Sequence, residues 1–106
     1  MEQLLEKLLG SVPKARILRL LMRNPEEQFR IEEISSRSQV RVRTARMELK
    51  KLAGLGIIHL GVGQTELRRK KGGRARFKKV PIWSANTGFI AFRELRDLIA
   101  RASVAP

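Results

Sequence analysis

Residues 29 to 58 read FRIEEISSRSQVRVRTARMELKKLAGLGII and carry the most regular pattern in the chain. The spacing of apolar residues predicts a short helix over residues 31 to 38 and a longer helix over about 41 to 55. Ala45, Leu49 and Leu52 share one face of the longer helix, and Gly56 is suited to its C-terminal end. We therefore expect two helices joined by a turn at residues 38 to 40.

Two further helices are predicted before this stretch. EQLLEKLL has leucines at one-turn spacing and stops at Gly10, which predicts a short helix within residues 1 to 10. SVPKARILRLLMRNP, residues 11 to 25, predicts a second helix with Ser11 as N-cap, Pro13 in the first turn and Asn24-Pro25 at the end. QFRI, residues 28 to 31, is expected to be extended.

A β-hairpin and a last helix are predicted after it. IIHLGV and ARFKKVPIW read as strands, and the glycines at 72 and 73 suit a tight turn between them. Phe77 and Val80 do not alternate strictly, which indicates a bulge near Lys78-Lys79, and we expect Phe77 to anchor the hairpin in the core. Pro81 indicates an edge strand. NTGFIAFRELRDLIARA, residues 86 to 102, predicts a helix capped by residue 86 or 87.

This order of elements resembles the winged helix-turn-helix family. The likeness covers residues 11 to 100 and is carried by SVPKARILRLL, by ELKKLAGLGII and by FRELRDLI. It is similar to small regulators of the arsenical-repressor and multiple-drug-repressor type, and to winged-helix regulators associated with minimal nucleotidyltransferases. Ser38, Gln39 and Arg41 depart from the residues usual in that family's turn.

The resemblance implies an α+β fold that is mostly helical and forms a single domain over residues 1 to 106. A winged helix-turn-helix core over residues 11 to 84 would carry a basic β-hairpin wing. Additional helices would lie at the N-terminus, residues 1 to 10, and at the C-terminus, residues 85 to 106.

The positive charge is concentrated in the middle of the chain. The 106 residues include 23 Lys and Arg and 10 Asp and Glu, for a formal net charge of +13. Residues 37 to 84 carry 14 of these cations but only Glu48 and Glu66 as acids, whereas acids and bases nearly balance on either side. Such a distribution favours a directed patch for a polyanion over a general solubility coat.

The outward face of the longer predicted helix forms the first part of this patch. Its candidate DNA-binding residues are Arg41, Arg43, Thr44, Arg46, Met47, Lys50 and Lys51. Arginines can pair with guanine, Thr and Met can contact a thymine methyl group, and lysines can reach phosphates. The alternative is an ordinary solvated helix face. We favour DNA recognition, because uncompensated like charges on a helix are unfavourable without an anionic partner.

The second part is RRKKGGRARFKK, residues 68 to 79, with eight cationic side chains. Crowded like charges repel, and phosphates would relieve that repulsion, so we expect the wing over residues 62 to 79 to lie on phosphates or in the minor groove. Its candidate DNA-binding residues are Arg68, Arg69, Lys70, Lys71, Arg74, Arg76 and Lys78. The alternative is a basic loop that keeps the protein soluble.

Other functions find less support in the sequence. There is no cysteine and a single histidine, His59, and we see no catalytic set, phosphate-binding glycine loop or zinc-ligand spacing. We therefore expect neither an enzyme nor a metal or cofactor site. No apolar run reaches membrane-spanning length and the N-terminus does not read as a signal peptide, so we expect a cytoplasmic protein.

The terminal helices carry more apolar surface than a small core should need. We expect a possible homodimer through Leu4, Leu5, Leu8, Phe89, Phe92, Leu95 and Ile99. Dimerisation would place two recognition helices about one DNA turn, roughly 34 Å, apart. The alternative is that both helices pack on the chain's own core.

We conclude that the sequence predicts a protein that binds double-stranded DNA and regulates transcription. Two alternatives stay open: a winged helix that binds RNA, and an interaction adaptor for a nucleotidyltransferase-like partner. The chain has few aromatic residues and no tyrosine. This leaves little for stacking on single strands and favours duplex DNA.

Overall fold

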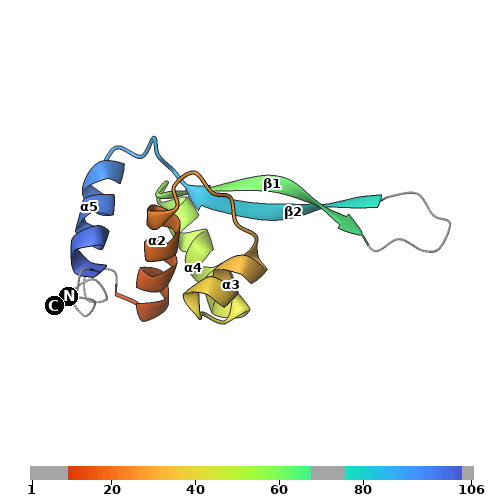
Figure 1. Cartoon of the computed structure of the whole chain (residues 1–106), viewed down its shortest axis with the longest axis horizontal. Coiled ribbons are helices and arrows are strands. Elements are labelled where there is room, and N and C mark those ends of the chain that lie inside the picture. Colours follow the sequence, from red (N-terminus) through yellow and green to blue (C-terminus); the bar gives the residue numbers. More distant parts are fainter. Residues whose placement is uncertain (1–9, 68–75, 104–106) are drawn as a thin grey trace.

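A computed structural model describes residues 10–67 and 76–103. Within these ranges the fold is α+β and mostly helical, as predicted, with four helices and one antiparallel hairpin (Figure 1). The elements in chain order are α2 (Val12–Arg23), α3 (Ile31–Ser38), α4 (Val42–Gly54), β1 (Ile58–Leu67), β2 (Arg76–Ala85) and α5 (Phe92–Ser103). The helix expected within residues 1 to 10 lies outside the described residues.

Helix α2 begins and ends where the sequence predicts. The Lys14 backbone N–H donates to Ser11 Oγ over 3.2 Å, which caps the N-terminus, and Pro13 lies in the first turn. At the other end, Asn24 Nδ2 donates to the Leu20 carbonyl over 2.8 Å. The amide side chain thereby satisfies one of the last carbonyls of the helix, and the chain turns away at Pro25.

The turn between α3 and α4 contains the chain's one described non-glycine residue with positive φ. Gln39 has φ 57°, and the Val40 N–H donates to the Ser35 carbonyl over 3.2 Å. Asn and Gly are more usual in such a C-terminal cap, and this backbone conformation is mildly unfavourable for Gln. Val40 is buried directly after it, so apolar burial helps hold the turn closed.

Helix α4 packs its predicted face inward. Ala45, Leu49 and Leu52 are all buried, and they meet Ile17, Leu18 and Leu21 of α2 in a single core. Gly56, with φ 80°, follows the helix as expected and turns the chain into β1. Ile34 of α3 belongs to the same core, so apolar burial shared by α2, α3 and α4 fixes the arrangement of these three helices.

The hairpin is regular along its whole described length. Pairing runs without interruption from Ile58↔Ala85 to Leu67↔Arg76, so the bulge expected near Lys78-Lys79 is wrong. The anchoring role expected of Phe77 is also wrong, because its side chain is 60% exposed. The outer half of the hairpin projects beyond the helices (Figure 1). It has no core to pack against, so neither of its two faces has to be apolar.

The base of the hairpin is joined to the helical body by Phe29 and Trp83. Their backbones exchange two hydrogen bonds, N to O, of 2.8 and 2.7 Å, which confirms the extended segment before α3. Residues two apart on a strand present their N–H groups to the same edge, so the missing N–H of Pro81 falls on this outer edge of β2. Pro81 therefore costs the β1–β2 ladder nothing.

The C-terminal helix begins later than predicted. Helix α5 starts at Phe92, so the expected cap at Asn86 or Thr87 is wrong. Asn86 instead joins two turns: its side chain donates to the Gly56 carbonyl over 2.7 Å and accepts from the Gly88 N–H over 3.0 Å. An Asn side chain that bonds nearby backbone in this way favours a turn over a helix.

Four apolar residues in α5 and just before it pack on the chain's own core. Phe92 and Ile99 are buried, and Phe89 and Leu95 pack against the same core at its edge. This corrects the expectation that Phe92 and Ile99 could contact a second subunit, because neither is accessible. Leu4, Leu5 and Leu8 lie outside the described residues. Of the described helices, none is both long and apolar enough to cross a bilayer.

Candidate nucleic-acid interface

The outward face of α4 is basic and open. Arg43, Arg46, Met47 and Lys50 are all exposed, opposite the buried Leu49 stripe, and Met47 has half of its surface accessible. None of the three cations makes a side-chain hydrogen bond or ion pair with another residue in the described part of the chain. The face therefore combines unneutralised charge with one flexible apolar side chain.

The start of α4 adds to this face. Arg41 occupies the N-cap position, is exposed, and offers no side-chain acceptor to the first N–H groups of the helix. A helix N-terminus without a side-chain cap is a favourable place for an anion, because its N–H groups and dipole point outward. Thr44, by contrast, is half-buried, so only part of its side chain is accessible to a ligand.

The inner face of α4 contains a carboxylate that sequence reasoning assigned no role. Glu48 is 5% exposed, and its carboxylate lies 3.6 Å from Lys14 Nζ and 4.0 Å from Lys51 Nζ. The pairing with Lys14 connects α4 to α2 and partly neutralises a buried charge. Lys51 is therefore partly engaged with Glu48, which reduces its availability to a phosphate.

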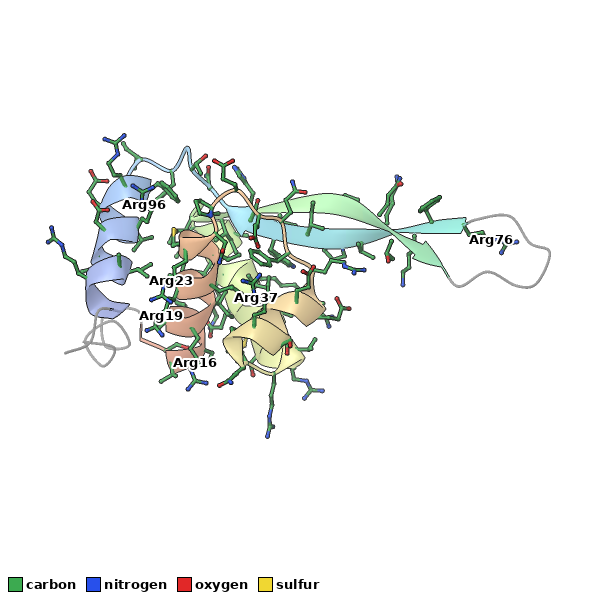
Figure 2. The ribbon with its side chains drawn as sticks, in the orientation of Figure 1. Arg16, Arg19, Arg23, Arg37, Arg76 and Arg96 are labelled. Atoms are coloured by element: carbon green, nitrogen blue, oxygen red, sulfur yellow. The ribbon has the colours of Figure 1, made fainter. Side chains whose placement is uncertain are left out.

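The hairpin contributes a short basic strip. Side chains alternate between the two faces of a strand, so Arg76 and Lys78 share one face and Phe77 and Lys79 share the other. Lys78 lies directly across from Thr65 in the register and is exposed. Arg76 is also exposed, at the end of the described hairpin that lies far from the helices (Figure 2). Arg68, Arg69, Lys70, Lys71 and Arg74 lie outside the described residues. The described part of the hairpin thus supplies Arg76, Lys78 and Lys79.

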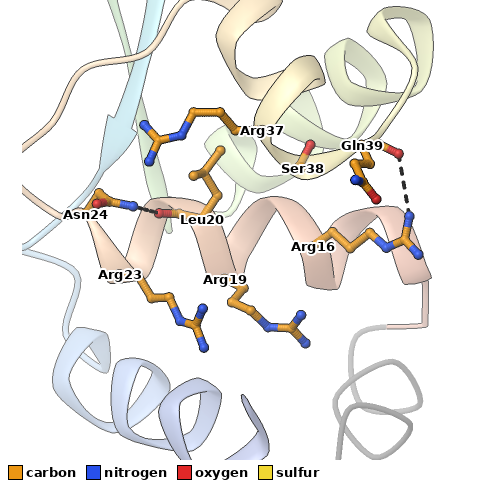
Figure 3. A pocket seen from close by; sticks show the side chains of 8 residues that line it. All are labelled: Arg16, Arg19, Leu20, Arg23, Asn24, Arg37, Ser38 and Gln39. Atoms are coloured by element: carbon orange, nitrogen blue, oxygen red, sulfur yellow. Dashed lines mark hydrogen bonds between the residues drawn. The ribbon is translucent and has the colours of Figure 1, made fainter. Parts of the chain in front are cut away.

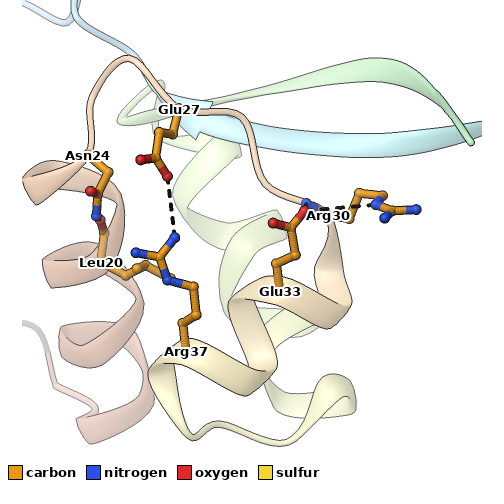
Figure 4. A network of polar contacts seen from close by, with 6 residues as sticks. All are labelled: Leu20, Asn24, Glu27, Arg30, Glu33 and Arg37. Carbon is orange, nitrogen blue, oxygen red and sulfur yellow. Dashed lines mark hydrogen bonds and ion pairs between the residues drawn. The ribbon is translucent and has the colours of Figure 1, made fainter.

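Arg30 joins the helical body to this strip. Its Nη1 donates to Thr65 Oγ1 over 2.9 Å, so its guanidinium lies on the hairpin face that also carries Lys78. Arg30 is the N-cap of α3, and its Nε lies 3.8 Å from a Glu33 carboxylate oxygen (Figure 4). The sequence analysis missed Arg30, because no local pattern reveals a contact across 35 residues.

An open groove of about 440 Å³ separates the start of α3 from the hairpin. Arg30 and Glu33 line one side, and Gly63, Val80 and Ile82 line the other. Gly63 lets the Ile82 side chain lie close to the β1 backbone, because a Cβ there would lie 2.8 Å from Ile82 Cγ2. The α3 side of the groove is polar, whereas Val80 and Ile82 make the hairpin side partly apolar.

Comparisons with known proteins give little further information. No protein-family model matches the chain, and no curated protein matches it. The chain is similar to the solved structure of a possible transcriptional regulator from Methanosarcina mazei Go1, at 16% sequence identity and a TM-score of 0.48. The alignment covers 81% of this chain and 61% of that chain, so this chain spans less than two thirds of that regulator.

Proposed function

We propose that this protein binds duplex DNA as a transcriptional regulator, with α4 in the major groove and the hairpin on neighbouring phosphates. One observation carries the proposal. Arg43, Arg46 and Lys50 stand exposed on one face of α4 with no carboxylate partner in the described part of the chain. Like charges at three- and four-residue intervals along a helix disfavour the folded state unless an external polyanion neutralises them.

The dimensions and chemistry of α4 suit this role. A helix with its side chains is about 10–12 Å across, close to the major-groove width of roughly 12 Å. Arg43 and Arg46 would pair with base edges, Met47 would contact a thymine methyl group, and Lys50 would hold a phosphate. The N–H groups at the start of α4, next to Arg41, would bind a second phosphate.

The hairpin and Arg30 would fix the orientation of the protein on the duplex. Phosphate contacts position a protein and base contacts give it sequence preference. Arg30, Arg76 and Lys78 are exposed on one face of the hairpin, which supports a phosphate-binding role for that face. Homodimerisation stays a prediction, and sedimentation at high protein concentration would test it.

The experiment is an anisotropy titration of labelled duplex DNA, duplex RNA and single-stranded DNA at several salt concentrations. If about six phosphates are neutralised, log Kd against log salt should have a slope of magnitude near 5 for duplex DNA. A slope near zero would overturn the electrostatic basis of the proposal. Tighter binding of duplex RNA than of duplex DNA would instead support an RNA-binding winged helix.

A further inference from the structure

A second basic feature lies away from α4, on helix α2. Four arginines line one open cavity of about 470 Å³: Arg16, Arg19 and Arg23 from α2, and Arg37 from α3 (Figure 3). Neither the resemblance stated above nor the proposed DNA surface gives these residues a role. Among the described residues that line the cavity there is no carboxylate and only one large apolar side chain, Leu20.

The sequence builds this cavity from helical spacing and one unusual turn. Positions 16, 19 and 23 recur at three- and four-residue intervals, so they form a stripe along α2. Ile17, Leu18 and Leu21 occupy the buried side of the same helix. The left-handed conformation of Gln39 ends α3 and leaves Arg37, in the last turn, beside this stripe.

Most hydrogen-bonding capacity in the cavity belongs to the guanidinium groups. The Asn24 amide donates to the Leu20 carbonyl and the Ser38 hydroxyl donates to the Ile34 carbonyl, so both are already engaged with backbone. Arg16 Nη1 donates to the Gln39 carbonyl over 3.5 Å, which is a long bond and uses one of its five donors. Arg19 has an interaction within the fold and its Nε and Nη2 are buried, so the donors that a ligand could use come from Arg16, Arg23 and Arg37. The cavity offers few acceptors.

One carboxylate lies nearby and has to be considered. Arg37 Nη1 is 3.3 Å from Glu27 Oε2, and both side chains are about half exposed. An exposed pair of this kind contributes little stability, so it does not prevent Arg37 from also binding an anion. Arg37 additionally stacks over the Phe29 ring at 5.2 Å, which holds its guanidinium in place.

We propose that this cavity binds a compact polyphosphate anion. Guanidinium groups match phosphate oxygens in a bidentate geometry, and several in one cavity suit a ligand with several adjacent phosphates. The volume falls within the range of about 300–1,000 Å³ typical of small-ligand sites. No aromatic residue lines the cavity in the described part of the chain, so no aromatic ring there would stack on a nucleobase.

The cavity and the basic face of α4 point in different directions. Helices α2 and α4 pack against each other through Leu18, Leu21, Leu49 and Leu52, so their exposed faces turn apart. In Figure 2 the α2 arginines lie at the front of the molecule, and α4 passes behind α2 and α3. A straight duplex on α4 would leave the cavity free, and the two sites can therefore be tested separately.

The test is isothermal titration calorimetry with inorganic triphosphate as the ligand, at about 150 mM salt. The double variant R16Q/R23Q removes two guanidiniums from the cavity, and R93Q/R101Q on α5 is its charge-matched control. We expect saturable binding by wild type, a loss of about tenfold or more in R16Q/R23Q, and a change below about threefold in the control. R16K/R23K should show an intermediate loss of affinity, because lysine keeps the positive charge but cannot form the paired hydrogen bonds of a guanidinium group.

Four results would overturn the proposal. Binding that does not saturate, or equal losses in both Gln variants, would show only non-specific attraction to a basic protein. Equal affinity for sulfate and triphosphate would exclude a multi-phosphate site. If R16Q/R23Q weakened the binding of duplex DNA as strongly as that of triphosphate, the cavity would belong to the nucleic-acid surface. The titration needs no DNA, so its failure leaves the proposed function unaffected, and circular dichroism would verify that each variant is folded.

Discussion

Helices α3 and α4 are adjacent in sequence and both carry exposed arginines, but only one of them neutralises its charge. Arg30 at the start of α3 lies beside Glu33, and Arg37 at its end pairs with Glu27. On α4, Arg43 and Arg46 have no such partner in the described part of the chain, and the helix's only acid, Glu48, faces the core. Among the described residues, the chain pairs its arginines on α3 but not on α4, and the proposed contact with a nucleic acid rests on this difference.

The most severe test of this comparison is to remove the open charge. The variant R43Q/R46Q/K50Q should bind duplex DNA about 100-fold more weakly or worse at moderate salt, because it removes the side chains proposed for two bases and one phosphate. The salt slope should fall in magnitude by roughly 1 for each phosphate that the variant no longer neutralises. Anisotropy titration measures both effects.

R93Q/R101Q, which removes two exposed charges from α5, is the control for non-specific attraction. If it weakened DNA binding as much as the α4 variant, the net charge alone would explain the affinity. The stability of the α4 variant in urea should be unchanged or slightly increased, since like-charge repulsion is reduced.

The second test addresses the inner face of α4. The substitution Glu48→Ala should destabilise the protein by about 1–3 kcal/mol, because it leaves Lys14 without its carboxylate and opens a small cavity. Urea denaturation followed by circular dichroism measures the change. The isosteric variant E48Q separates charge from packing. Equal stability of E48A and wild type would show that the α2–α4 pairing contributes nothing.

A smaller effect is expected at the contact between body and hairpin. Arg30→Gln removes the hydrogen bond to Thr65 and one cation from the hairpin face, so duplex affinity should fall about three- to tenfold with little change in sequence preference. Competition titrations against two unrelated duplexes measure the preference. T65V removes the same hydrogen bond without a charge and is the matched control; an equal loss of affinity there would show that positioning of the hairpin matters more than the charge.

The smallest effect is expected where the charge is already paired. Arg37→Gln should change the free energy of unfolding by no more than about 1 kcal/mol, because exposed ion pairs and cation–π contacts each contribute little. DNA affinity should stay within about twofold of wild type. A large loss of DNA binding in R37Q would contradict the distinction between the paired arginines of α3 and the unpaired arginines of α4.

Sequence reasoning succeeded where local rules act. The ends of α2 were predicted correctly from Ser11, Pro13 and Asn24, because capping and proline geometry are local. The burial of Leu49 and Leu52 was predicted correctly because helical periodicity identifies the packed face of a helix. It failed where the outcome depends on distant parts of the chain. Phe77 was expected in the core, but the alternation rule applies only where a strand has a core to face, and the outer hairpin has none.

The difference between local and distant determinants also explains why the start of α5 and the polar contacts were not predicted. Asn86 can cap a helix or close a turn, and the choice depends on the Gly56 carbonyl, 30 residues away. The Arg30–Thr65 bond and the Lys14–Glu48 pair also join residues far apart in sequence. The candidate residues of α4 could be identified because exposure follows from periodicity; their partners, or lack of partners, could not.

The attachment of the hairpin has a mechanical consequence. Ten paired residues at about 3.3 Å each make an arm of roughly 30 Å that is joined to the body at its base, by Phe29 and Trp83. On such an arm a tilt of about 10° at the base displaces the far end by about 5 Å, which exceeds the spacing of about 3.4 Å along the axis between successive phosphates of one DNA strand. In the proposed DNA complex, the packing of Ile82 against Gly63 would then help to set which phosphate the arm reaches. A methyl group added at Gly63 would shift the position of the arm on DNA without itself contacting DNA.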